Sequence, residues 1–313
     1  NYRSFICGIK GLKLNNKEIQ FLKKYRPWGI ILFSRNIQTI NQTQQLTKSI
    51  KKIFKKDNYP ILIDEEGGRV SRLRSIIDNS IFSAKFFGDL YIKDKNKFNI
   101  YFNVYTKQIS YLLKLLGINI NTSPILDLRR NFSHNIIGDR SYSQNKNLIS
   151  KIGNVCIDNY HKNKIATVIK HIPGHGLAKV DSHKNVPIIS KNLSYLIKND
   201  FKLFKNKKTL FAMTGHLIFN KIDKTNTVTH SKKIIKLIRT KIGFKNIIIT
   251  DDLSMKALKY SIAENAKKSF NAGCDLALHC NGNIKEMTEL AENSPKINKF
   301  IAKKTSQFEE IIS

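Results

Sequence analysis

IIITDDLSMKAL, residues 247–258, joins an apolar run to two adjacent carboxylates, Asp251 and Asp252. Residues 247–250 have the continuous apolar and β-branched character of a strand that is buried on both faces of a parallel sheet. The residues that follow can begin a helix. The stretch therefore predicts a strand–helix unit with ionisable groups at the carboxyl end of its strand.

The same arrangement recurs along the chain. Eight β-rich runs are predicted strands: residues 5–9, 29–33, 61–63, 118–120, 167–169, 210–213, 247–250 and 276–278. Helical periodicity covers residues 37–54, 101–116, 148–160, 193–204, 232–242 and 262–272, and about thirty residues at the C-terminus read as a charged helix that closes the barrel. This alternation predicts an α/β fold, a (β/α)8 TIM barrel, with residues 1–313 as one catalytic domain. A glycine-rich dinucleotide fingerprint does not follow the first strand, which argues against a Rossmann fold.

Ionisable residues follow five of the predicted strands. In a TIM barrel the carboxyl ends of the strands meet on one rim, where the chemistry of such enzymes lies. The sequence therefore predicts a site on this rim, where it places Asp64, Lys170, His171, His216, Asp251, Asp252 and His279. His279 is expected to be a core or rim residue rather than a catalytic one.

KHIPGHGLAKVDSH, residues 170–183, contains three histidines, an aspartate and a lysine. One interpretation is a metal site made of His171, His175, Asp181 and His183, although the spacing differs from H-E-x-x-H. A second is that the histidines only cap and pack the loop. A third is that Asp181 orients His183 and stabilises its protonated form, which makes the pair a proton donor and acceptor near neutral pH.

Three further stretches carry candidate site residues. Asp252 has the character of a helix cap or structural residue, which leaves Asp251 as a candidate nucleophile or base. ILIDEEGGRVSRLR, residues 61–74, offers Asp64 as an acceptor and Arg72 as a donor, and GDRSY, residues 138–142, adds Arg140. Such groups suit a polyhydroxylated ligand. The residues alone leave an ordinary solvated turn open as well.

The charge balance raises a rival function. Lys and Arg total 55 and Asp and Glu 23, so the formal charge is 55 − 23 = +32, which is typical of some nucleic-acid-binding proteins. The lysines are dispersed rather than gathered in one stripe, which favours a solvated basic surface without nucleic acid as a partner. The four cysteines form no C-x-x-C pair, and neither a secretory signal nor an 18-residue apolar run is present. We therefore expect a cytoplasmic protein without a membrane segment.

Eight motifs occur in one order along the chain: IDEEGGRVSR, SPILDL, IGDRSY, KHIPGHG, DSH, AMTGH, TDDLSM and NAGCD. Together they resemble glycoside hydrolase family 3, and within it the single-domain β-N-acetylhexosaminidases of bacterial cell-wall recycling. The combination of KHIPGHG with DSH is typical of the N-acetylglucosaminidase branch. Ser71 and Gly215 depart from the pattern, since relatives often carry Gln and Ala at these positions.

The resemblance implies roles for individual residues. Asp251 would be the nucleophile of a retaining double displacement, His183 the acid and base, and Asp181 its orienting partner. The sugar would be held by Asp64, Arg72, Arg140, Lys170 and His171. The resemblance also implies a monomer that acts on N-acetylglucosaminyl-anhydromuramyl peptides without a metal or an organic cofactor. It does not separate hydrolysis from phosphorolysis. Gly174 and Gly176 predict a loop that can hold the dyad away from Asp251 when no ligand is bound.

Overall fold

The computed structural model describes residues 2–131, 137–180 and 185–313. Eight parallel strands close into a barrel in the order β1-β10-β9-β7-β5-β4-β3-β2. They are β1 (Arg3–Gly8), β2 (Pro27–Leu32), β3 (Ile61–Ile63), β4 (Ile120–Asn121), β5 (Ala166–Ile172), β7 (Phe211–Thr214), β9 (Ile247–Asp252) and β10 (Leu276–His279). Each predicted strand overlaps one of them, so the (β/α)8 prediction is confirmed.

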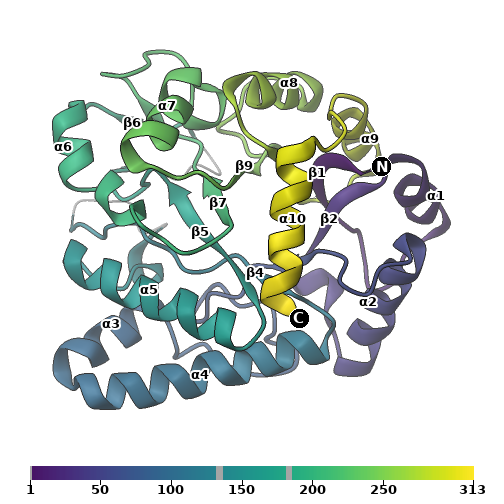
Figure 1. Cartoon of the computed structure of the whole chain (residues 1–313), viewed down its shortest axis with the longest axis horizontal. Coiled ribbons are helices and arrows are strands. Elements are labelled where there is room, and N and C mark those ends of the chain that lie inside the picture. Colours follow the sequence, from purple (N-terminus) through teal and green to yellow (C-terminus); the bar gives the residue numbers. More distant parts are fainter. Residues whose placement is uncertain (1, 132–136, 181–184) are drawn as a thin grey trace.

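Helices surround the barrel on its outside (Figure 1). They are α1 (Asn16–Tyr25), α2 (Ile40–Phe54), α3 (Ala84–Lys93), α4 (Lys95–Leu115), α5 (Lys146–Lys162), α6 (Leu193–Lys198), α7 (Lys232–Leu237), α8 (Ile262–Ala272), α9 (Ile284–Glu292) and α10 (Lys299–Ile312). The predictions missed α1 and α3, and the charged helix predicted over about thirty C-terminal residues is two helices, α9 and α10. The predicted helix 193–204 is α6 followed by the separate 3₁₀ turn η3 (Phe201–Phe204). Within the described chain, no helix is both long and apolar enough to cross a membrane.

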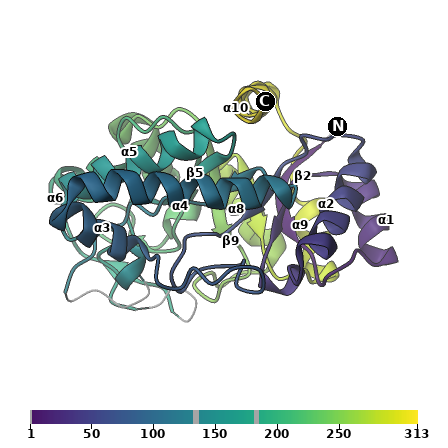
Figure 2. The same ribbon diagram turned by 90° about the horizontal axis from the view of Figure 1, so that it is seen from below.

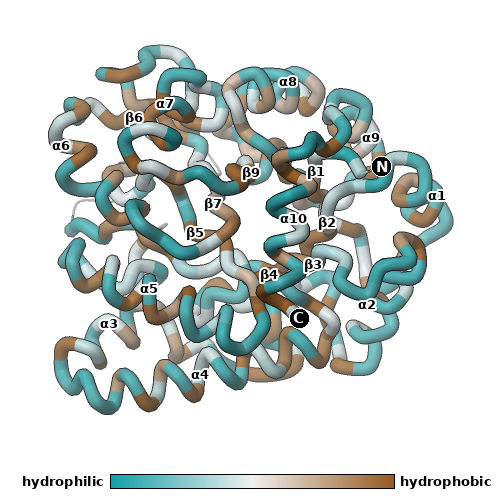
Figure 3. Tube along the Cα trace, in the orientation of Figure 1, coloured by the Kyte–Doolittle hydropathy of each residue, from teal (hydrophilic) through white to brown (hydrophobic). Residues whose placement is uncertain are grey.

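Each strand buries side chains on both of its faces. In β9, Ile247 and Ile249 belong to the cluster inside the barrel, whereas Ile248 packs in the layer between strands and helices. This explains the continuous apolar runs of the sequence. On the tube of Figure 3 the outer helices alternate between hydrophobic and hydrophilic residues, as expected for helices with one face against the barrel.

The C-terminal helix α10 covers the amino-terminal end of the barrel, which it crosses in Figure 1 and flanks in Figure 2. Its Phe308 ring lies 6.4 Å from Trp28 and 6.0 Å from Phe211, measured between centroids. The indole N–H of Trp28 donates to Thr305 Oγ1 at 2.8 Å. The sequence prediction of a closing helix is therefore confirmed, and the opposite, carboxyl end of the barrel remains for the site.

A small parallel sheet outside the barrel was not predicted. It pairs β6 (Ile188–Ile189) with β8 (Ile218–Phe219), with Ile188 opposite Ile218. The two segments follow β5 and β7 along the chain, so this pairing joins the β5 loop to the β7 loop at the rim.

Candidate active site

A cavity of about 180 Å³ opens at the carboxyl ends of the strands. Six predicted site residues line it together: Asp64, Arg72, Arg140, Lys170, His171 and Asp251. The cavity wall also includes Glu66, Arg69, Val70, Ile137, His175, Met213, Leu278 and Cys280. Asp181 and His183 lie outside the described residues. The prediction that their loop holds them away from Asp251 concerns those residues too and stays a prediction.

Lys170 connects two of the acidic residues of this cavity, Asp64 and Glu66. Its side chain is 3% exposed, and its ammonium group lies 2.9 Å from Asp64 Oδ1 and 2.7 Å from Glu66 Oε1, and donates to Thr122 Oγ1 at 3.0 Å. Burial alone would lower the pKa of Lys170, but the two carboxylates outweigh it and raise this pKa above its ordinary value. Burial would likewise raise the pKa of Asp64, but Lys170 and Arg72 hold it far below its usual range. Lys170 and Asp64 are therefore both charged at neutral pH.

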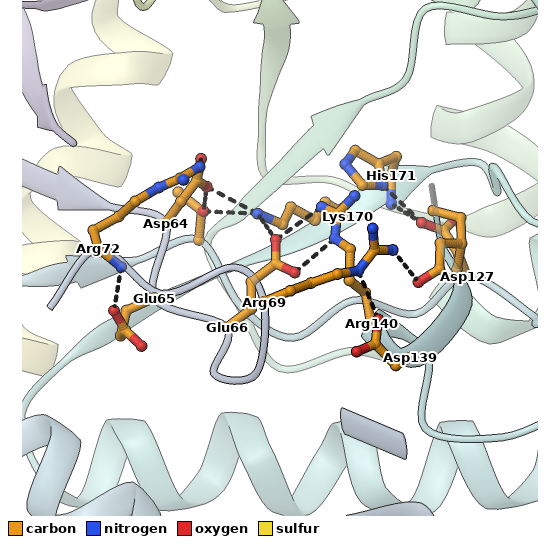
Figure 4. A network of polar contacts seen from close by, with 12 residues as sticks. Asp64, Glu65, Glu66, Arg69, Arg72, Asp127, Asp139, Arg140, Lys170 and His171 are labelled. Carbon is orange, nitrogen blue, oxygen red and sulfur yellow. Dashed lines mark hydrogen bonds and ion pairs between the residues drawn. The ribbon is translucent and has the colours of Figure 1, made fainter. Parts of the chain in front are cut away.

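Glu66 is a site residue that the sequence did not single out (Figure 4). Its two oxygens accept from Arg140 Nε at 2.8 Å and Nη2 at 2.9 Å, in a bidentate pair. Burial opposes its ionisation, but Arg140 and Lys170 lower the pKa of Glu66 to about 2. Glu66 thereby fixes the directions of two cations that face the cavity.

The neighbouring Glu65 does not line the cavity but forms hydrogen bonds within the loop that follows β3. It is fully buried and accepts from the Ser71 hydroxyl at 3.0 Å, the Arg72 N–H at 2.8 Å and the Asn79 amide at 2.7 Å. The turn between the acids and Arg72 requires Gly67, whose φ is +80° and where an added Cβ would lie 2.3 Å from the Phe82 carbonyl oxygen. Ser71, a departure from the family pattern, thus helps to position Arg72.

Asp127 is a second residue that sequence reasoning missed, although it lies in the quoted SPILDL motif. It is fully buried, and its Oδ2 lies 2.7 Å from Nδ1 of His171 (Figure 4). The backbone N–H groups of His171 and His175 donate to the same carboxylate at 3.2 and 2.6 Å. Burial would raise the pKa of Asp127, but His171 and these donors lower it. The ionised carboxylate therefore fixes Nδ1 of His171 as a donor and turns Nε2 away from itself.

Asp251 lies at the end of β9, where the sequence predicted it. Its Oδ1 accepts from the Asp252 N–H at 2.8 Å. Burial would raise the pKa of Asp251, but His216 and His171, the Asp252 N–H and Lys170 together lower it. At neutral pH Asp251 is thus an ionised carboxylate in the cavity wall, as a nucleophile requires.

Asp252 does not cap a helix, because the N-cap of α8 is Ser261. Instead its Oδ1 accepts from the N–H groups of Ser254 and Cys280, each at 3.1 Å. The bond to Cys280 joins the end of β9 to the residue after β10. The capping interpretation was wrong, and Asp252 has the alternative structural role.

Two histidines predicted on the rim, His216 and His279, are buried next to the site rather than in the cavity wall. Nε2 of buried His216 donates to the Asp252 carbonyl oxygen at 2.9 Å, and Nδ1 lies 2.8 Å from Thr229 Oγ1. His279 is also buried, with Nε2 2.7 Å from Glu286 Oε2. His216 uses both of its ring nitrogens in these contacts, whereas Nδ1 of His279 has no hydrogen-bond partner among the described residues. Neither ring lines the cavity.

His175 lines the cavity but is only 3% exposed, and both of its ring nitrogens lack a hydrogen-bond partner. Burial is the main reason why the pKa of His175 falls to about 4, with His171 contributing. Among the described residues, no group of three His, Cys, Asp or Glu side chains is placed to hold a metal ion. The metal site considered from the sequence also includes Asp181 and His183, which lie outside the described residues.

Comparison with known proteins agrees with this geometry. Residues 6–306 match the glycosyl hydrolase family 3 N terminal domain, and the chain belongs to this family of glycoside hydrolases. A β-hexosaminidase of Haemophilus influenzae is 30% identical over 316 residues, covering 93% of this chain and 85% of the relative.

Solved structures of NagZ from Neisseria gonorrhoeae are similar over almost the whole chain. The complex with N-trifluoroacetyl-D-glucosamine is 28% identical with a TM-score of 0.86, and covers 98% of this chain and 90% of NagZ. The complex with zinc ion is 27% identical, with the same TM-score and coverage.

Proposed function

We propose that this glycoside hydrolase is a retaining exo-β-N-acetylglucosaminidase that removes terminal β-linked N-acetylglucosamine from peptidoglycan fragments. The observation that carries the proposal is the ionised Asp251 in the wall of a cavity that Asp64, Arg140 and Lys170 also line. A carboxylate nucleophile in one cavity with fixed donors and an acceptor suits a sugar ring whose anomeric carbon is attacked while its hydroxyls are held.

In the proposed reaction, an oxygen of Asp251 forms a bond to the anomeric carbon as the bond to the leaving oxygen breaks. His183 gives that oxygen its proton. Water then attacks the same carbon, His183 takes the proton from water, and Asp251 is released. Two inversions at one carbon give net retention. Asp181 would orient His183 and stabilise its charge; both residues are assigned from the family resemblance.

The choice of sugar is supported by the relatives. The Haemophilus influenzae relative is a β-hexosaminidase, and the Neisseria gonorrhoeae NagZ binds N-trifluoroacetyl-D-glucosamine, an N-acylated glucosamine. The peptidoglycan fragment as substrate rests on the resemblance to cell-wall recycling enzymes. We further propose that the protein acts in the cytoplasm as a monomer with one catalytic domain.

The proposal is tested by hydrolysis of a 4-nitrophenyl N-acetyl-β-glucosaminide, followed by proton NMR of the first-formed sugar. A β-anomer at early times is expected, whereas an α-anomer would refute retention. Running the reaction with and without phosphate separates the two outcomes that the sequence left open, because phosphorolysis yields a sugar 1-phosphate. Full activity after chelation would exclude a required metal. This control is included because the relative from Neisseria gonorrhoeae has been solved in complex with zinc ion.

A further inference from the structure

Two lysines are buried in the described part of the chain, and only one has acidic partners. Lys170 is 2% exposed and contacts two carboxylates, whereas Lys207 is 8% exposed and forms no ion pair with a described carboxylate. The ammonium group of Lys207 instead donates to the Ser150 carbonyl at 3.2 Å, the Ser150 hydroxyl at 2.8 Å and Asn154 Oδ1 at 2.8 Å. Burial without a counter-charge lowers the pKa of Lys207 to about 8. A buried cation of this kind is costly unless an anion lies nearby.

The two side chains that accept hydrogen bonds from Lys207, Ser150 and Asn154, keep donor groups of their own. Because Asn154 accepts with Oδ1, its amide NH₂ group is left to donate. Ser150 accepts with Oγ, so its hydroxyl hydrogen is directed elsewhere. Both residues lie on α5 and line an outer cavity of about 300 Å³. Lys207 therefore contacts two residues that line this cavity without lining it itself.

The rest of the cavity is also rich in donors. It lies between α5 and η3, on the outside of the barrel, and its wall consists of Lys146, Asn147, Ser150, Lys151, Asn154, Lys202 and Leu203. None of these lining residues, all of them described, is acidic. Lys146 is held by neutral oxygens, at 3.1 Å from both the Lys198 carbonyl and Asn199 Oδ1. The two nearby acids face elsewhere: Asp200 forms a bidentate pair with Arg130, and Asp158 lines a neighbouring cavity.

We propose that this outer cavity binds a phosphate group, as the free ion or as part of a phosphorylated small molecule, with Lys146, Lys151 and Lys202 around it and Lys207 behind it. A phosphate carries up to two negative charges at neutral pH and several acceptor oxygens, which suits several lysines better than one carboxylate does. This cavity shares no lining residue with the catalytic cavity. Phosphate bound here is thus a separate ligand, not a nucleophile in the hydrolase reaction.

The test is phosphorus NMR titration of the substrate-free protein with inorganic phosphate and pyrophosphate, at constant ionic strength, together with thermal unfolding. We expect saturable binding and a rise in Tm. The double variant Lys151→Met/Lys202→Met removes two exposed ammonium groups without touching the core, and should weaken binding roughly tenfold or more. Lys236→Met, which removes an exposed lysine from α7, should bind phosphate like the parent protein. Hydrolytic activity should be the same in all three proteins.

Lys207→Met distinguishes the proposal from a purely structural crosslink between α5 and the segment before β7. A crosslink alone predicts a lower Tm but the same phosphate-induced rise, whereas the proposed site predicts that this rise is also largely lost. The proposal is overturned if the parent protein shows no saturable binding. It is equally overturned if the double variant and Lys236→Met lose the same small amount of affinity.

Discussion

Nδ1 of His171 lies 2.7 Å from Oδ2 of the fully buried Asp127, and His171 lines the candidate active-site cavity. An ionised carboxylate can only accept, so Nδ1 of His171 carries a proton and Nε2 is the nitrogen left for a ligand. The predicted sugar contact of His171 therefore depends on a residue that does not line the cavity itself.

Asp127→Asn should lower kcat/KM for the aryl N-acetyl-β-glucosaminide by roughly 10- to 100-fold, the size of the loss when a metal-binding histidine loses its orienting carboxylate. Asparagine can donate as well as accept, so it no longer fixes the ring nitrogen that carries the proton. The matched control is Asp275→Asn, because Asp275 pairs with Arg239 at 2.6 Å and does not line the cavity. Equal kcat/KM values for the two variants would contradict an orienting role for Asp127.

Lys170→Met should destabilise the fold by about 3 kcal/mol or more, because it leaves Asp64 and Glu66 as neighbouring, partly buried carboxylates without their shared cation. The loss should shrink at acid pH, where a proton can replace the missing charge. Urea unfolding at pH 7 and pH 5 measures both effects. The exposed lysine substitution Lys236→Met should change stability by less than about 0.5 kcal/mol. A Lys170→Met loss of that same size would refute the assigned network.

His175 should make the protein acid-labile. Its pKa is about 4 in the fold, below the ordinary value of 6.5, so the unfolded chain takes up a proton first as the pH falls. Its contribution to stability is complete above pH 6.5 and is lost as the pH falls to 4, by roughly 3 kcal/mol if this histidine acts alone.

The variant His175→Leu isolates that contribution, since leucine cannot be protonated and leaves no buried ring nitrogen unpaired. The free energy of unfolding, measured between pH 7 and pH 4.5, should fall less steeply for the variant than for the parent. Parallel pH profiles for the two proteins would show that His175 is not held neutral by the fold.

The sequence predicted the barrel well because buried parallel strands are continuous apolar runs. Residues 276–278, for example, all lie within β10. The fourth strand begins later than predicted, at Ile120. Asn119, predicted as strand, still bonds both neighbouring strands through its backbone, to the Ile61 carbonyl at 3.1 Å and the Ala166 N–H at 3.0 Å. Its side chain adds bonds to the Ile61 N–H and the Tyr59 carbonyl, at 2.8 and 2.9 Å. Helix α3 lies in the long connection after β3, where no element was predicted, and it buries only Phe87 and Gly88.

The candidate site was predictable only in part. Strand ends marked Asp64, Lys170 and Asp251, because their positions follow from the fold. The sequence could not show that Glu66 would face the cavity while its neighbour Glu65 turned under the loop. Such a choice depends on the tertiary partners of each carboxylate, here Arg140 and Asn79. The same holds for Asp127, whose partner lies 44 positions away in the chain.

Trapping the glycosyl-enzyme decides whether Asp251 is the nucleophile. The protein is incubated with an activated, slowly hydrolysed 5-fluoro derivative of N-acetylglucosamine, which keeps the 2-acetamido group, and is then digested, and the labelled peptide is sequenced by mass spectrometry. We expect one added sugar, on Asp251, together with loss of activity, and no label on an Asp251→Ala variant. A label on another carboxylate, or full turnover by Asp251→Ala, would contradict this assignment.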